Sequence, residues 1–293
     1  MIEIKNLKKS FSDTIACNNL SVNIESGIVG LVGENGAGKS TLFRLISNVI
    51  TQDAGTITID GFVNNTEDAK KRLFFLPDDP YIKANQSIDA IASFYDAFYT
   101  LDKEKFYNYV NYFQLPLKRR VNSFSKGMKR QLFIALTLSI DCKYYLLDEA
   151  FDGLDPVILS KIKEEILKKK EEGKVIIIAS HNINTLQQLT DRVLLLSKGR
   201  LEKDGTIDDM ASELIKYQIA CKDDIQKEDL RKAGFKILSL KKIGSITHIV
   251  IYSSPDFENY IKNSYHPIIF EKIPLDSEEV VMLNMLAAKE SEK

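Results

Sequence analysis

Several residue types that point to particular chemistries are scarce in this sequence. Its 293 residues include no tryptophan, three cysteines and three histidines. Cys17, Cys142 and Cys221 are odd in number and widely separated, so they form neither a disulfide framework nor a paired-cysteine metal motif. The histidines are equally scattered, which argues against a zinc centre. The composition therefore does not favour a disulfide-stabilised or a zinc-dependent protein.

Long apolar runs and an excess of charge of one sign are also lacking. The longest apolar stretches, such as Val175–Ala179 and Val193–Leu196, are far shorter than the ~18 residues of a membrane-spanning helix. Charges at Glu3, Lys5 and Lys8 interrupt any signal-peptide pattern. Forty Lys and Arg residues balance 41 Asp and Glu residues, so no global basic field would attract nucleic acid or an anionic membrane. We expect a cytoplasmic protein with no nucleic-acid partner.

The length and the hydrophobic patterns predict two domains. Buried strands that alternate with helical segments predict an α/β domain over residues 1–209. Helical periodicity between about residues 85 and 140 predicts an all-helical insert in that domain. Beyond Asp209 the order β-α-β-β-α-β with a terminal helix predicts a small α+β domain over residues 210–293, with a ferredoxin-like arrangement.

A glycine-rich segment follows a short apolar strand that ends at Val32. The segment Gly33–Ser40 fits the pattern G-x-x-x-x-G-K-[ST], and a helical pattern follows it. Glycines let main-chain N–H groups converge on phosphate oxygens, and the helix adds its positive N-terminus. In such a loop Lys39 would reach the β- and γ-phosphates, and the hydroxyl of Ser40 would ligate Mg²⁺. The segment predicts a nucleotide phosphate site.

Two carboxylates end a second apolar strand. Tyr144–Leu147 is followed by Asp148 and Glu149, as in the Walker B motif. Asp148 would hold Mg²⁺ through water, and Glu149 would orient and polarise a water molecule that attacks the γ-phosphate. Acidic residues often follow strands, so this pair gains its meaning from the phosphate loop upstream. Together the two motifs predict hydrolysis of a nucleoside triphosphate.

A set of motifs in one order resembles the nucleotide-binding subunit of ABC transporters. The motifs are Gly33–Ser40, Phe124–Gln131, Asp148 with Glu149, Gly153–Pro156 and Ala179–His181. The resemblance covers about residues 1–209. It implies a P-loop NTPase fold with a RecA-like core, an antiparallel β subdomain and a helical insert, and it implies ATP and Mg²⁺ as cofactors.

The resemblance also implies roles for individual residues. Phe11 matches the aromatic residue that stacks on adenine. Ser125 and Gly127 match the signature motif, which contacts the γ-phosphate of ATP held by the opposite subunit. Asp155 matches a residue at the dimer seam, and His181 matches the histidine that senses the γ-phosphate. The ATP contacts implied for the phosphate loop are Gly33, Asn35, Gly36, Ala37, Gly38, Lys39, Ser40 and Thr41.

Two positions depart from the usual pattern of that family. The signature reads Phe-Ser-Lys-Gly-Met instead of Leu-Ser-Gly-Gly-Gln, which retains the serine and the second glycine. Asp78 stands where a glutamine is expected after the strand Leu73–Leu76. An aspartate can still meet Mg²⁺ or its waters as a hard oxygen ligand, but it is shorter and anionic. Both departures resemble ABC-2-type bacterial exporters, including those of phenol-soluble-modulin or antimicrobial peptides.

The resemblance implies an ATPase that powers export through a separate integral membrane permease. Two copies, or this chain and a paralogue, would close head to tail around two ATP molecules at the cytoplasmic face of the membrane. The segment near Pro80–Asn85 is the expected dock for the permease.

Two alternatives stay open, a soluble ABC-fold ATPase that acts on nucleic acid or the ribosome and a regulatory ATP-binding module. The single cassette and the near-zero net charge argue against the first. The presence of Lys39, Asp148, Glu149 and His181 argues against the second.

Overall fold

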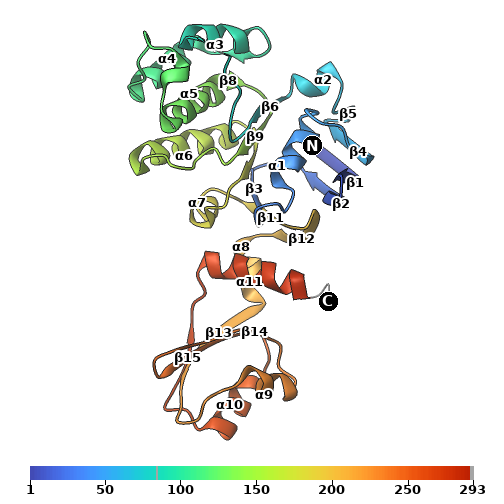
Figure 1. Ribbon diagram of the computed structural model, residues 1–293, viewed down its shortest axis with the longest axis vertical. Helices are drawn as coiled ribbons and strands as arrows, with labels where there is room; N and C mark the ends of the chain where they lie inside the picture. The colour runs from blue at the N-terminus through green and yellow to red at the C-terminus, as the bar shows by residue number, and fades with distance from the viewer. Residues whose placement is uncertain (84, 291–293) are drawn as a thin grey trace. The chain divides into compact units, whose positions relative to one another are not determined.

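The computed structural model describes residues 1–83 and 85–290. The chain divides into two units (Figure 1), and the boundary between them in the sequence falls between Asp204 and Gly205. The predicted boundary at Asp209 lies within helix α8 (Ile207–Ser212). No helix among the described residues is long and apolar enough to cross a membrane.

An antiparallel sheet in the order β2-β1-β4-β5 contains the first strands of the chain. Its strands are β1 (Ile2–Phe11), β2 (Thr14–Ile24), β4 (Ala54–Ile59) and β5 (Phe62–Val63). Ile4 pairs with Val22 on one side and with Ile57 on the other, and all three are buried. Because side chains alternate across a strand, these residues give the sheet one apolar face. The predicted antiparallel β subdomain is confirmed.

A second sheet has the order β12-β11-β3-β10-β9-β6 and forms the centre of the first unit. Its strands are β3 (Ile28–Val32), β6 (Leu73–Leu76), β9 (Tyr144–Asp148), β10 (Val175–Ala179), β11 (Arg192–Ser197) and β12 (Arg200–Gly205). The pairs β6–β9, β9–β10, β10–β3 and β3–β11 are parallel. Every residue of β3, β9 and β10 is buried, as expected for a parallel sheet covered on both faces. The predicted α/β class is confirmed.

Helices α1 (Lys39–Ile46), α2 (Glu67–Lys70), α6 (Pro156–Glu171) and α7 (Ile183–Gln187) connect the strands of this unit. The insert contains α3 (Ile88–Asp96), α4 (Lys103–Tyr112), a 3₁₀ turn at Val121–Ser123 and α5 (Lys126–Ser139). Figure 1 shows α3, α4 and α5 gathered in a lobe of their own.

The expectation that the insert is entirely helical is wrong in one detail. Strands β7 (Thr100–Leu101) and β8 (Ile140–Asp141) form a short antiparallel ribbon that closes the lobe. Strands of two residues are too short to produce a period-two pattern, so the helical periodicity on both sides hid this ribbon in the sequence.

The second unit begins with α8 and contains a four-stranded antiparallel sheet in the order β14-β15-β13-β16. Its elements are β13 (Leu214–Ala220), α9 (Lys227–Lys232), β14 (Ile237–Ile243), β15 (Ile246–Tyr252), α10 (Phe257–Tyr265), β16 (Ile269–Ile273) and α11 (Ser277–Glu290). This order and connectivity are those of the predicted ferredoxin-like arrangement. Tyr217, Ile249, Phe257 and Ile261 form part of a core between the sheet and its helices.

A buried lysine links α6 to the central sheet. Lys169 is 5% exposed, and its ammonium donates hydrogen bonds to the carbonyl of Ile140 at 3.1 Å and to the hydroxyl of Tyr145 at 2.9 Å. Burial lowers the pKa of Lys169 to about 8. The hydroxyl of Tyr145 also donates to Ile140, so the carbonyl keeps a partner without the lysine.

We predict that Lys169→Met alters the pH dependence of stability. The pKa of Lys169 in the folded state lies below the ordinary value of 10.5, so the folded protein releases this proton first as the pH rises. The free energy of unfolding of the wild type should therefore rise relative to the variant between pH 8 and 10.5, by at most about 3 kcal/mol. Urea unfolding followed by circular dichroism would measure this, and parallel pH profiles would contradict it.

Candidate functional site

The phosphate loop joins the end of β3 to the start of α1. Gly36 and Gly38 have φ angles of 83° and 106°, which L side chains rarely adopt. A Cβ at Gly38 would also clash with the main-chain oxygen of Ala16. Because α1 begins at Lys39, its first N–H groups have no acceptor within the helix and are available to a phosphate. The predicted loop therefore has the backbone that anion binding requires.

Lys39 is folded back onto its own loop. Its ammonium donates to the carbonyl of Gly33 at 2.6 Å and to the carbonyl of Glu34 at 3.2 Å, and the residue is 7% exposed. Burial lowers the pKa of Lys39, while the nearby carboxylates of Glu149 and Asp148 raise it. A buried cation thus lies beside Asp148, the last residue of β9, and Glu149, which follows that strand.

Asp148 has the surroundings of a metal-binding carboxylate. It is 3% exposed, and its Oδ1 atom is buried without a hydrogen-bond partner among the described residues. Burial raises the pKa of Asp148, a hydrogen bond with Ser40 lowers it, and the charge of Asp78 raises it further. An unpartnered carboxylate oxygen, a serine hydroxyl and a second carboxylate form the all-oxygen set that Mg²⁺ prefers. These residues fit the expected metal.

Glu149 and His181 lie together at the ends of β9 and β10. The backbone of Glu149 is left-handed, with φ 48°, and its N–H donates to the carbonyl of Ala179 at 2.8 Å. Its Oε2 atom accepts a hydrogen bond from the main-chain N–H of His181 at 3.2 Å and lies 3.0 Å from Nδ1 of that residue. Burial and Asp152 raise the pKa of Glu149, while His181 and Lys39 lower it. This carboxylate is thus held in a fixed orientation.

Lys39, Ser40, Asp78 and Glu149 share one pocket of about 440 Å³, which we call the phosphate pocket. It is lined by Phe11, Thr14, Ala16, Asn35, Gly36, Gly38, Lys39, Ser40, Thr41, Asp78 and Glu149. All of these residues except Thr14 and Ala16 are candidates that the sequence itself indicates. Thr14 pairs with Phe11 across the turn between β1 and β2, so the hairpin register is the signal that locates it.

The signature residues do not line the phosphate pocket of their own chain. The hydroxyl of Ser125 caps α5 by accepting a hydrogen bond from the N–H of Met128 at 3.2 Å. Gly127 lies in a separate depression with Asp152 and Gly153. Asp155 caps α6 by accepting a hydrogen bond from the N–H of Val157 at 2.8 Å. The predicted ATP-binding residues thus fall into two groups: those at the phosphate pocket, and Ser125, Gly127 and Asp155 away from it.

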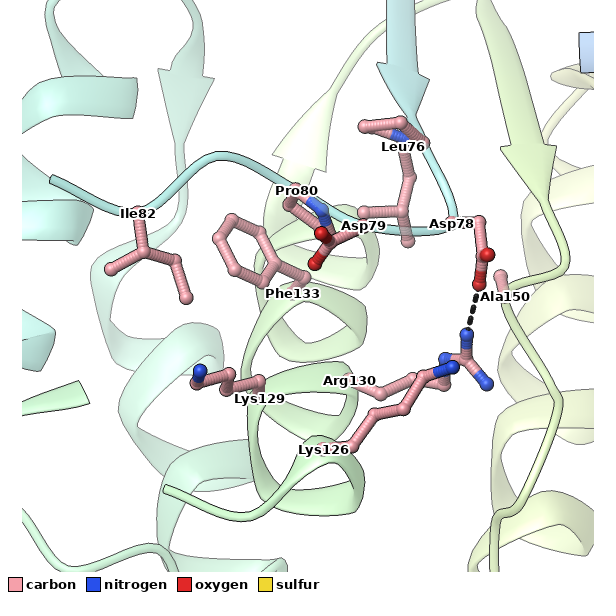
Figure 2. Close-up of a pocket in the computed structure, with 11 residues that line it drawn as sticks. Leu76, Asp78, Asp79, Pro80, Ile82, Lys126, Lys129, Arg130, Phe133 and Ala150 are labelled. Carbon is pink, nitrogen blue, oxygen red and sulfur yellow. Dashed lines mark hydrogen bonds and ion pairs between the residues drawn. The ribbon is translucent and has the colours of Figure 1, made fainter. Parts of the chain in front are cut away.

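The site contains one functional candidate that the sequence analysis missed. Arg130, in α5, forms an ion pair with Oδ1 of Asp78 at 2.5 Å (Figure 2). A second nitrogen of its guanidinium donates to the main-chain carbonyl of Asp152. Arg130 lies within the motif segment Phe124–Gln131, but no role was predicted for it, because its partners Asp78 and Asp152 are distant in the sequence.

Comparisons with known proteins agree with this geometry. The ABC transporter family profile matches residues 17–152. The ABC transporter ATP-binding protein YtrB of Bacillus subtilis is 28% identical over 290 residues, which cover 96% of each chain. The lantibiotic transport ATP-binding protein SrtF of Streptococcus pyogenes is 31% identical over 75% of this chain and 97% of SrtF.

A solved structure of the ATP binding subunit of an ABC transporter is similar in fold as well. It is 25% identical, with a TM-score of 0.66, over 72% of this chain and 91% of its own. The fold and the phosphate pocket define a P-loop nucleotide-binding protein. Given its similarity to SrtF along nearly all of that protein, the chain belongs to the family of ABC transporter ATP-binding proteins.

We predict that Gly38→Ala weakens ATP binding at least about tenfold, because the added methyl group clashes with the carbonyl of Ala16 in a backbone that disfavours L residues. Gly61→Ala is the matched control. Gly61 has a φ of 84°, but a Cβ there meets no atom within 4 Å and the residue lies outside the phosphate pocket. Titration with a fluorescent ATP analogue would measure both. Equal affinities for the two variants would contradict the prediction.

Proposed function

We propose that this chain is the ATP-hydrolysing subunit of an ABC exporter. The observation that carries the proposal is the Glu149–His181 contact beside Lys39 at one edge of the central sheet. That arrangement supplies an oriented carboxylate, a cation and a phosphate loop in one place. The similarity to SrtF, a lantibiotic transport ATP-binding protein, supports a role in transport and a lantibiotic-like compound as the cargo.

In this proposal ATP occupies the phosphate pocket. The adenine stacks on the exposed ring of Phe11, and the N–H groups of the loop bind the phosphates. Lys39 exchanges its two loop carbonyls for phosphate oxygens. Ser40 and Asp148 would hold Mg²⁺, Asp148 through water and with Asp78 nearby, and the ion would neutralise charge on the β- and γ-phosphates.

Hydrolysis then depends on the residues at the ends of β9 and β10. Glu149 orients and polarises the water that attacks the γ-phosphate, and its raised pKa favours acceptance of a proton. His181 holds this carboxylate in place and lies where it can sense the γ-phosphate. The charge of Lys39 stabilises the oxygens of the transferring phosphoryl group.

A second ATP-binding subunit completes the site. Ser125 and Gly127 lie away from the phosphate pocket of their own chain, and Ser125 begins a helix whose N-terminus favours an anion. We therefore place them against the ATP of a partner subunit, with Asp155 at the seam. The partner is a second copy of this chain or a paralogue.

A groove on the first unit is the proposed dock for the membrane permease. It has a volume of about 650 Å³, and its apolar and aromatic lining comes mainly from β6, α3 and the segment that follows α3, while α2 adds charged side chains at one side. Phe94, in α3, and Phe98, just after that helix, line the groove and are 54% and 64% exposed. Such exposed aromatics fit an apolar cytoplasmic segment of a permease. The chain would then work at the cytoplasmic face of the membrane.

The dock expected near Pro80–Asn85 stays a separate prediction, because no described residue of that segment lines the groove. Tyr81 in that segment is 87% exposed, and Ala84 lies outside the described residues.

We predict that Glu149→Gln binds ATP with the affinity of the wild type but turns over at least about 100-fold more slowly, because the amide cannot accept the proton of the attacking water. ATP-bound closed dimer should accumulate and be visible by size-exclusion chromatography. Glu171→Gln, at an exposed position at the end of α6, is the control and should behave as the wild type. Normal turnover by Glu149→Gln would remove this residue as the catalytic carboxylate.

We also predict that Phe94→Ser combined with Phe98→Ser abolishes copurification with an integral membrane protein, while ATP binding is unchanged. The exposed apolar area that a permease segment would bury is lost, but the phosphate pocket is not touched. Tyr112→Ser, an exposed aromatic of α4 outside the groove, is the control. Recovery of soluble partners alone from wild-type membranes would contradict the exporter proposal itself.

A further inference from the structure

Arg130 is a buried cation between two loops of the proposed ATP site. Its side chain is 7% exposed, and burial of a guanidinium is costly unless its donors are satisfied. One donor is paired with Asp78, which follows β6, and another with the carbonyl of Asp152, which follows Glu149. Arg130 lies in the first turns of α5, the helix that begins at the signature residues and that we call the signature helix.

Asp78 lies between two depressions and lines both of them. On one side it lines a depression with Lys126, Lys129 and Arg130 (Figure 2). On the other side it lines the phosphate pocket with Lys39 and Ser40. Its side chain is 50% exposed, and the ion pair with Arg130 uses Oδ1. The carboxylate can therefore keep its arginine while its second oxygen turns toward the pocket.

We propose that Arg130 is a positioning residue, which holds Asp78 for Mg²⁺ and links that contact to the signature helix and to the loop after Glu149. The proposal rests on the proposed function, because it assumes that ATP and Mg²⁺ occupy the phosphate pocket. The role of Arg130, and of its contacts with Asp78 and Asp152, goes beyond that function.

The chemistry of the two side chains explains why they occur together. Aspartate has fewer rotatable bonds and a shorter reach than glutamine, so its oxygen meets a metal only if the carboxylate is held near it. Carboxylates that ligate metals are commonly oriented by a second hydrogen-bond donor, and loss of that donor weakens metal affinity. A guanidinium offers several donors in a planar fork, so Arg130 can hold Asp78 and Asp152 simultaneously.

Mg²⁺-dependent nucleotide binding tests the proposal without relying on turnover. The dissociation constant of a fluorescent ATP analogue would be measured with Mg²⁺ and with EDTA. We expect Arg130→Gln to weaken Mg²⁺-dependent binding by about tenfold and to leave binding in EDTA unchanged. Arg130→Lys, which keeps the charge, should recover part of the loss. Asp78→Asn should weaken Mg²⁺-dependent binding to a similar extent, and Arg130→Gln should then add nothing.

Lys129→Gln provides a matched control, since Lys129 is a cation of α5 that lines the same depression. Wild-type behaviour of Arg130→Gln in the presence of Mg²⁺ would overturn the proposal. Tighter Mg²⁺-dependent binding would overturn it as well, because the arginine would then compete with the ion. An equal effect in the Asp78→Asn background would reduce Arg130 to a general packing role. If the wild type bound no ATP in either condition, the proposed function would fail instead.

Discussion

Parallel pairing of β6, β9, β10 and β3 is the constraint on which the whole site depends. In parallel strands the carboxyl ends meet at one edge of the sheet, and ligands bind there. The register pairs Asp148 with Ala179 and Leu147 with Leu76, so the residues that follow these strands converge although they are distant in sequence. A shift of one residue would exchange the two faces of a strand and turn Asp148 away from its partners. The apolar strands thus specify a polar site.

Charged groups at the phosphate pocket are arranged in a way that suits a nucleotide and its metal. Lys39 bonds to carbonyls of its own loop, and Oδ1 of Asp148 has no partner among the described residues. The backbone of Glu149 adopts a left-handed conformation, which is sparsely populated for residues other than glycine. The unpartnered carboxylate oxygen and the left-handed backbone each cost free energy in the folded chain, whereas the two hydrogen bonds of Lys39 satisfy its charge. In the proposed function, phosphate oxygens and a divalent cation would give Lys39 and Asp148 new partners at this same edge of the sheet.

Local patterns were sufficient to predict the main strands, the phosphate loop and the acidic pair, because each is encoded in consecutive residues. The α/β class and the order of the second unit followed from the same patterns. What could not be predicted depends on partners from distant segments. Arg130 gains its meaning only when Asp78 and Asp152 approach it, and the exposure of Phe94 depends on which neighbours cover α3. Periodicity assigns residues to one face but does not say what covers that face.

The two units differ in how they relate to the ATP chemistry. The proposed site residues, from Phe11 to His181, all lie in the first unit. YtrB matches 96% of this chain, whereas SrtF matches 75% of it along nearly its own full length. Some members of the family therefore function as ATP-binding proteins within a shorter chain. The second unit has its own core around Tyr217 and Phe257 and needs no residue of the phosphate pocket for its packing. The second unit therefore contributes no residue to the proposed ATP site, and any role that it has is separate from the chemistry of that site.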